Sequence, residues 1–225
     1  MVEALKTAGG IDLWLVRSPG LPLVVMEFAC HGGARRDPAS MSGLANFMSG
    51  MLDEGAGPLD SDAFQSALAD HAVSLRFDAS RDEFSGRMRC LASKASEAFG
   101  LLRLAVSEPH FADDAVERVR GQILASLKGE MQSPEEICRK LFSSKAFPGH
   151  AYGRPVKGDL ASVTTINAAA LGRQMPQILQ REGLKVVLVA DMTAMDASRR
   201  VDEVFAALPA GAVQQVDGDA GQVRV

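Results

Sequence analysis

Apolar residues recur along the chain with two different periods, which separate strand-like from helix-like segments. Residues 11–16 and 23–30 are two apolar runs joined by a Pro-Gly turn, and this arrangement predicts a β-hairpin. Residues 73–77 and 84–90 alternate between apolar and polar side chains, which predicts two antiparallel strands. A further apolar run over residues 184–190 predicts a buried strand.

In most of the remaining chain, apolar residues recur with the spacing of an α-helix. The longest helix is predicted to begin at Asp113, because apolar residues recur three or four positions apart from Val116 to Met131. Further helices are predicted over residues 42–52, 61–69, 93–106, 133–142, 165–176 and 196–208, with Ser42, Ser61, Ser133 and Thr165 as expected N-caps. These blocks of strands and helices favour an α+β fold, in which an antiparallel or mixed sheet is covered by helices on one side.

The composition is that of a globular protein. The 225 residues are 47% hydrophobic and 23% charged, with a mean hydropathy of +0.03. We expect a single domain over residues 1–210 and a linker, or the start of a second domain, over residues 211–225. If the protein continues beyond Val225, the isolated chain should expose an apolar patch where the next domain packs.

Charge and hydropathy exclude several classes of partner. The net charge of −4 shows no basic excess, and one Trp and one Tyr offer few surfaces for stacking bases, so nucleic acid is not an expected partner. No run approaches the roughly 18 apolar residues of a membrane-spanning helix. Residues 1–10 lack the apolar core of a secretory signal, so we expect none in this sequence.

The cysteines do not indicate a disulfide framework or a thiolate metal site. Cys30, Cys90 and Cys138 are odd in number and widely spaced, and the sequence contains no C-x-x-C motif. We therefore expect three buried free thiols.

Three segments, in order, resemble the pitrilysin, insulinase and mitochondrial-processing-peptidase family of zinc peptidases. Residues 43–55, with the sequence GLANFMSGMLDEG, resemble the family's G-L-A-H-F-L-E-H-M-L-x-x-G helix and follow a G-x-R-x-D loop. The long helix before Pro134 stands where the family carries a zinc-binding Glu. Residues 150–158 resemble the family's H-P-Y-x-x-P-x-x-G loop, in which we expect His150 and Tyr152 to anchor the loop rather than to act in catalysis.

The resemblance implies a zinc site whose residues are all replaced in this chain. In the family motif H-x-x-E-H, two histidines one helical turn apart hold zinc and the Glu acts as general base. The two histidine positions correspond to Asn46 and Gly50, the base position to Ser49, and the distant Glu to Ser126. An amide, a bare backbone and two hydroxyls neither bind zinc tightly nor accept a proton near neutral pH. We therefore predict no catalytic residue, no metal ligand and no zinc cofactor.

The resemblance also implies partners. Such a domain is expected to pair with a catalytic, motif-bearing subunit or second domain and to help enclose an extended peptide. In the family, a substrate adds as a strand to a sheet edge, and the corresponding residues here are Phe77, Asp78, Ala79 and Ser80. The Arg35-Arg36 pair is expected to form a solvated loop face.

Two other functions stay open at this point. One is a metallopeptidase with a divergent metal site, and the other is a non-proteolytic scaffold like the core proteins of respiratory complexes. The compartment is also open: the resemblance favours the periplasm, and the cytoplasm is the alternative.

Overall fold

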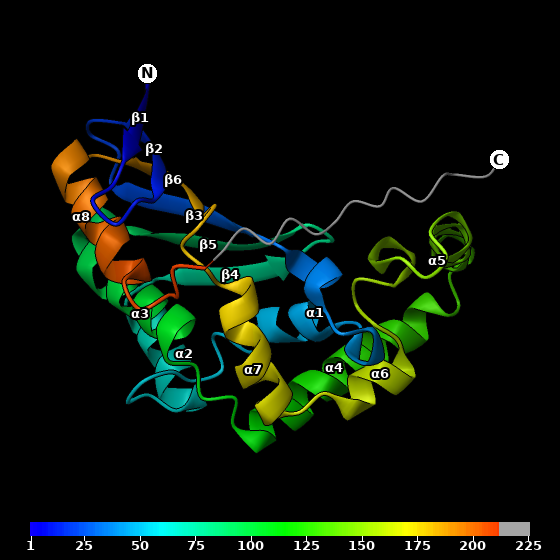
Figure 1. Ribbon diagram of the computed structural model, residues 1–225. Helices are drawn as coiled ribbons and strands as arrows, with labels where there is room; N and C mark the ends of the chain where they lie inside the picture. Colours follow the sequence, from blue (N-terminus) through cyan, green and yellow to red (C-terminus); the bar gives the residue numbers. More distant parts are fainter. Residues whose placement is uncertain (212–225) are drawn as a thin grey trace.

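A six-stranded mixed sheet forms one layer of the molecule, and helices cover one of its faces (Figure 1). The computed structural model describes residues 1–211. The strands are β1 (Val2–Lys6), β2 (Asp12–Arg17), β3 (Leu23–His31), β4 (Ser74–Ala79), β5 (Glu83–Leu91) and β6 (Lys185–Ala190), in the order β1-β2-β6-β3-β5-β4. Only β2 and β6 are parallel neighbours. The predicted α+β class with a mixed sheet covered on one side is confirmed.

The predicted hairpin of residues 11–16 and 23–30 is wrong. The two strands exist, but β6 lies between them, so that Val187 pairs with Trp14 on one side and with Glu27 on the other. The inward residues of β6 are fully buried, and a strand of this kind gains most from a central position in the sheet. The local pattern also missed β1, whose residues are mostly exposed and which is held by antiparallel pairing with β2.

Eight α-helices are present in the described residues. They are α1 (Leu44–Ser49), α2 (Ser61–Asp70), α3 (Ala95–Ser107), α4 (Asp113–Glu130), α5 (Pro134–Ala146), α6 (Leu160–Thr165), α7 (Ala168–Ile178) and α8 (Ala194–Phe205). The long helix is confirmed as α4, and α5 begins as predicted with Ser133 accepting a hydrogen bond from the Glu136 N–H. Residues 165–176 were predicted as one helix, but α6 ends at Thr165 and α7 begins after Asn167.

Two N-caps differ from the prediction by one or two residues. Asp60, and not Ser61, caps α2 by accepting a hydrogen bond from the Ala63 N–H. Asn167, and not Thr165, caps α7 through the Ala170 N–H. In both cases the neighbouring polar residue already lies inside a helix, where its side chain cannot reach the free amides of the first turn.

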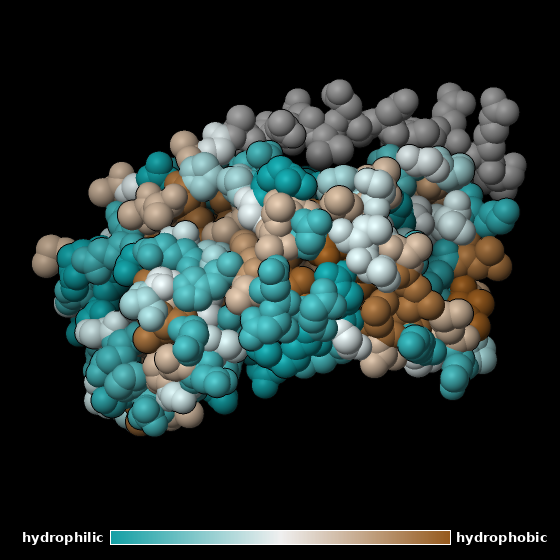
Figure 2. Space-filling model, turned by 90° about the horizontal axis from the view of Figure 1, so that it is seen from below, coloured by the Kyte–Doolittle hydropathy of each residue, from teal (hydrophilic) through white to brown (hydrophobic). Residues whose placement is uncertain are grey.

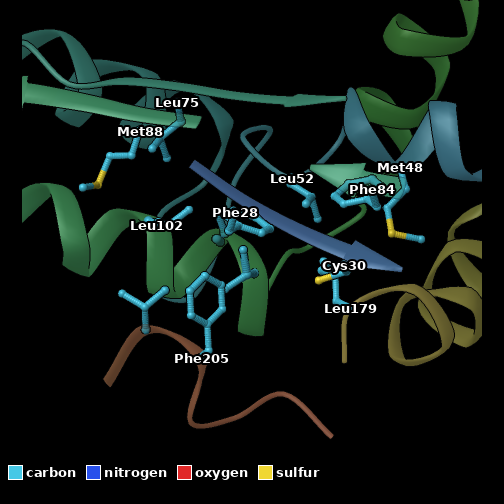
Figure 3. Close-up of a cluster of buried hydrophobic side chains, with 14 of the residues drawn as sticks. Phe28, Cys30, Met48, Leu52, Leu75, Phe84, Met88, Leu102, Leu179 and Phe205 are labelled. Carbon is cyan, nitrogen blue, oxygen red and sulfur yellow. The ribbon is translucent and has the colours of Figure 1, made fainter. Parts of the chain in front are cut away.

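The core lies between the sheet and the helices (Figure 3). The ring of Phe28 on β3 meets that of Phe205 on α8 edge to face, with 5.1 Å between ring centroids. Gly86 on β5 makes room for it, because a Cβ at this position would lie 2.2 Å from Phe28 Cε1. This close approach of strand to ring explains a glycine within a strand.

Two of the three cysteines fit the expected burial. Cys30 and Cys90 are buried on strands β3 and β5, whereas Cys138 on α5 is exposed. The prediction of three buried thiols is therefore wrong for Cys138, because α5 turns that side of its surface to solvent.

The other face of the sheet carries no helix within residues 1–211 (Figure 1). Its side chains alternate with the core residues and include Trp14, Glu27, Arg76 and Arg87, all partly or fully exposed. Over the described residues, none of the helices has the length and apolarity that crossing a membrane would need. The predicted linker or second-domain start at 211–225 lies, after residue 211, outside the described part of the chain.

Candidate functional site

Helix α1 lies against β4, the edge strand at one end of the sheet. One side of α1 enters the core through the buried residues Leu44, Ala45, Phe47 and Met48. Asn46 lies on the other side of the helix and is partly exposed, and Ser49 and Gly50 lie at the C-terminal end. The helix is shorter than predicted, since it ends at Ser49 and continues as turns.

A buried carboxyl group fixes the start of α1. Asp37 accepts hydrogen bonds from the Gly43 N–H (2.9 Å) and the Ala45 N–H (3.0 Å), so it does the capping predicted for Ser42. Ser42 instead donates to the Pro155 carbonyl oxygen. Burial raises the pKa of Asp37 to about 7, against the opposing effect of the two amide hydrogen bonds.

Two cavities flank α1 along the edge of β4. The larger has a volume of about 1000 Å³ and extends from Ser49 and Gly50 over the open face of the sheet. The smaller has a volume of about 400 Å³ and is bordered by Asn46. Asp78 on β4 lines both, so the two cavities are neighbours along the strand edge, and we refer to them together as the groove beside α1.

Three of the four positions predicted from the resemblance, Asn46, Ser49 and Gly50, border this groove, and Ser126 lines neither cavity. The Ser49 hydroxyl donates to the Asn46 carbonyl oxygen at 2.7 Å, so it is occupied within the helix. Gly50 terminates α1 in an ordinary right-handed conformation. On α4, Ser126 is exposed and lies on the same side as Val119 and Glu130, which are seven residues before it and four residues after it.

This donor set does not fit zinc. Zinc sites in proteins are built from thiolate, imidazole and carboxylate ligands, and Asn46, Ser49, Gly50 and Ser126 supply none of these. Among residues 1–211, no group of three or more His, Cys, Asp or Glu side chains is arranged to hold a metal ion. No hydrolytic step can therefore be derived from this arrangement.

A carboxylate held by two lysines forms part of the smaller cavity. Glu130, the last residue of α4, contacts Lys140 Nζ at 2.8 Å and Lys157 Nζ at 2.7 Å. Burial alone would raise the pKa of Glu130, but the hydrogen bonds from the two lysines lower it. The ion pairs tie α4 to α5 and to the loop before α6.

The loop over residues 150–158 is anchored next to the same cavity. The Tyr152 hydroxyl donates to Asp82 Oδ1 at 2.6 Å, and Arg81 donates to the Tyr152 carbonyl oxygen and to Ser143 Oγ. His150 Nδ1 accepts from the Tyr152 N–H. These contacts place His150 and Tyr152 in the framework of the loop.

Residues 77–80 occupy the position predicted for peptide contact. Phe77, Asp78 and Ala79 end the edge strand β4, and Ser80 begins the turn to β5. The Ser80 N–H bonds the Glu83 carbonyl oxygen, and the antiparallel alternation from this pair points the backbone groups of Phe77 and Ala79 away from β5. Contact with a peptide at this edge remains a prediction.

The Arg35-Arg36 pair is not a solvated face. Arg35 is paired with Asp82 at 3.4 Å, and its side chain is only 25% exposed. Arg36 donates to the Gln177 carbonyl oxygen and so joins the loop to α7. The G-x-R-x-D segment is therefore packed between the β4–β5 turn and α7.

Sequence reasoning missed the charged residues of the smaller cavity. Arg81, Glu130, Lys140 and Lys157 come from four separate segments of the chain. Each lies in a stretch whose polar residues are indistinguishable from an ordinary solvated surface. No spacing in the sequence signals their meeting.

The sequence and the fold agree on a family. The sequence model of the insulinase family (peptidase family M16) matches residues 17–160, which is more than half of the chain. The protein belongs to the insulinase family. It is 25% identical over 191 residues to the non-peptidase homolog YmxG of Helicobacter pylori, a match that covers 85% of this chain and 44% of the relative. The chain thus spans less than half the length of this curated relative.

Solved structures show the same fold. The peptidase M16 inactive domain from Pseudomonas fluorescens superimposes with a TM-score of 0.87 at 25% identity, over 94% of this chain and 52% of that one. Pitrilysin gives a TM-score of 0.80 at 17% identity, over 93% of this chain and 23% of its own. A protease from Helicobacter pylori gives 0.81 at 13% identity, over 95% and 52%.

Proposed function

We propose that this chain is a non-catalytic domain of an insulinase-family peptidase assembly, which pairs with a motif-bearing domain or subunit and helps to enclose an extended peptide. The observation that supports the proposal is that the side of α1 beside the β4 edge carries Asn46, Ser49 and Gly50, which the resemblance assigns to the positions of the two ligands and the base. The fold of the family is kept, while these residues lack the chemistry of its zinc site. We accordingly propose that the chain works without zinc.

The names of two relatives support the same reading. YmxG is described as a non-peptidase homolog, and the Pseudomonas fluorescens structure as an inactive domain. Each is about twice as long as the matched segment, or longer, so in these proteins a unit of this kind is joined to further chain. A domain that has lost its own chemistry is expected to act through such a neighbour.

Helix α5 supports the pairing, because its apolar side faces outward. Three of its four half-buried residues are polar, and two of these bond the rest of the domain: Lys140 bonds Glu130, and Ser143 bonds Arg81. By contrast, Ile137, Leu141 and Phe142 are 50%, 57% and 69% exposed. A surface helix of a globular protein normally turns its apolar side toward the core and its polar side toward solvent.

The exposed side of α5 belongs to a larger apolar patch. Met131 and Phe147, at the two ends of the α5 region, are also exposed. Helix α5 stands off from the other helices in Figure 1, and apolar side chains gather at the same end of the molecule in Figure 2. Apolar side chains clustered in this way mark interaction surfaces. We assign this patch, defined by Met131, Ile137, Leu141, Phe142 and Phe147, to the motif-bearing partner.

The groove beside β4 supports the enclosure of a peptide. An edge strand offers free backbone donors and acceptors to an added strand, and here the neighbouring cavity extends over the bare face of the sheet. A partner that covers α5 would close this groove from the side of the smaller cavity, which α5 borders through Arg139, Lys140 and Ser143.

The test is association with an insulinase-family domain or subunit that carries an intact H-x-x-E-H motif. Wild type should bind it in light scattering and change its rate of peptide cleavage. The double substitution L141Q/F142Q should lose binding and keep its melting temperature, because both side chains are already exposed.

A matched control is M195Q on α8, where Met195 is 79% exposed but lies outside the patch. This variant should associate as wild type does. Absence of both association and any effect on cleavage, with wild type and partner each folded, would refute the pairing.

A further inference from the structure

The smaller cavity beside α1 is positively charged, although the chain as a whole is negative. Its lining contains the four basic side chains of Arg81, Arg139, Lys140 and Lys157 against the two acidic ones of Asp78 and Glu130. The whole chain carries a net charge of −4. The excess of positive charge at this place is therefore local.

We propose that this cavity binds a carboxylate of the enclosed peptide, supplied by an acidic side chain or by the C-terminus, with Arg81 as the principal contact. The inference rests on the proposed function, because it names the class of peptide that the groove selects. It concerns recognition only and includes no covalent step.

The pairing of charges within the cavity singles out Arg81. Lys140 and Lys157 share the single negative charge of Glu130, so one positive charge of the two lysines remains. Arg139 is paired with Glu136. Within residues 1–211, the hydrogen bonds of Arg81 go to neutral groups, the Tyr152 carbonyl oxygen and Ser143 Oγ. No carboxylate of these residues neutralises its positive charge, which can therefore bind a ligand.

These neutral contacts also hold Arg81 in place. Its guanidinium carbon lies 5.8 Å from the centre of the Tyr152 ring, and the ring is fixed in turn by the bond from its hydroxyl to Asp82. A guanidinium has five N–H donors, so two such bonds leave donors for a carboxylate. A side chain that is already positioned loses less conformational entropy when it binds a ligand.

The position of the cavity matches the path of an added strand. Residues 78–81 line it, so the C-terminal end of β4 leads directly into it. A peptide that pairs with the open edge of β4 would place one end, or the side chains at that end, against Arg81. Successive side chains of a strand alternate between its two faces, so a carboxylate is selected at one register.

A positively charged group of a peptide would bind unfavourably in this cavity. A basic side chain would face Arg81, which pairs with no carboxylate of residues 1–211, and the remaining positive charge of Lys140 and Lys157. Asp78 is the acidic group that opposes a carboxylate, and it is exposed at the junction with the larger cavity, where water screens it. The other acidic group, Glu130, is already paired with Lys140 and Lys157.

The test is a binding assay with fluorescent peptides of alternating Val and Thr that differ only in charge. One pair carries Glu or Gln near one end with the C-terminus amidated, and a second pair carries Gln with a free or an amidated C-terminus. Charged hydrogen bonds of this kind are worth about tenfold in affinity, so one charged member should bind about tenfold more tightly than its neutral partner. The pair that shows the difference identifies the source of the carboxylate.

The variant R81Q should reduce that preference to about threefold or less. R89Q is the matched control, because Arg89 is exposed on the neighbouring strand β5 and lines neither cavity, and it should retain the preference. If R81Q does not fold, the wild type provides the second measurement, since a preference based on charge must weaken as salt concentration rises.

Failure of this inference is distinct from failure of the proposed function. Equal binding of charged and neutral peptides by wild type, or a preference that R81Q leaves intact, would overturn the assignment to Arg81 while peptide binding itself stands. Absence of binding by every peptide would overturn both.

Discussion

Gly50 at the end of α1 lies directly beside Val119 on α4. A Cβ at position 50 would be 3.2 Å from Val119 Cγ1, closer than ordinary van der Waals contact. The two helices are therefore closely packed at the position that, by the family resemblance, corresponds to the second zinc-binding histidine.

Restoring the family residues should create a zinc site only if this contact is relieved. We expect N46H/S49E/G50H/S126E to bind zinc weakly, because an imidazole at position 50 collides with Val119. Adding V119A should raise the zinc content toward one per chain, since a shorter side chain removes the obstacle. Elemental analysis after dialysis against a mild chelator measures the content.

The wild-type chain and the single variant V119A serve as controls and should carry no stoichiometric zinc. Zinc bound tightly to the wild type would show that the protein uses ligands other than these four positions. In that case the proposed loss of metal chemistry would be wrong.

Only one thiol should react in the folded protein. Burial raises the pKa of Cys30 to about 12 and that of Cys90 to about 11, so both stay protonated and shielded, whereas Cys138 is exposed. A thiol reagent should modify one group in the native state and all three in denaturant. The variant C138S should show no rapid reaction, and two rapidly reacting thiols in the wild type would contradict the burial of β3 and β5.

The same thiol reports on the proposed partner. Cys138 lies on α5 among the exposed apolar residues of the patch. Binding of the motif-bearing partner should slow its modification markedly, because a covered thiol is inaccessible to the reagent. An unchanged rate under conditions in which the complex forms would place the interface elsewhere on the molecule.

The buried carboxyl group of Asp37 predicts a specific pH dependence. Its pKa is about 7 in the folded state against 3.8 for the free side chain, so the folded state holds the proton more tightly. The stability contributed by this group is present below about pH 4 and is lost as the pH rises through about 7, by roughly 1.4 kcal/mol for each unit of difference between the two pKa values.

The variant D37N lacks this titration and keeps only one acceptor oxygen for the two amides of α1. Chemical denaturation over this pH range should show the wild type losing its advantage over D37N as the pH rises. An advantage that grows with pH would mean that the carboxylate caps α1 in its ionised form.

A pair of glycine substitutions tests the packing of the sheet. G86A should destabilise the protein by about 1–3 kcal/mol, because the new methyl group collides with the Phe28 ring. G121A, in the middle of α4, meets no atom within 4 Å and should stabilise the protein by up to about 1 kcal/mol. Denaturant midpoints of the two variants should move in opposite directions, and equal shifts would contradict the position of Phe28.

The sequence determined the elements whose signals are local. Pro109 marked the end of α3, and Ser133 and Pro134 marked the start of α5. The apolar stripe of α4 followed from its spacing of three and four residues. The segments over residues 43–55 and 150–158 sufficed for the family. That Asn46, Ser49, Gly50 and Ser126 stand at the family's site positions stays a prediction from the resemblance, whereas their lack of zinc-binding donors follows from residue type alone.

Only the tertiary structure decided which distant residues meet. The insertion of β6 between β2 and β3 depends on pairing across the whole length of the chain, which no local period encodes. The outward orientation of the apolar side of α5 could not be predicted from the sequence either, because an apolar stripe has the same spacing whether it faces a core or a partner. The cationic cavity around Arg81 arises from four segments that fold together, and its charge exists only where their side chains converge.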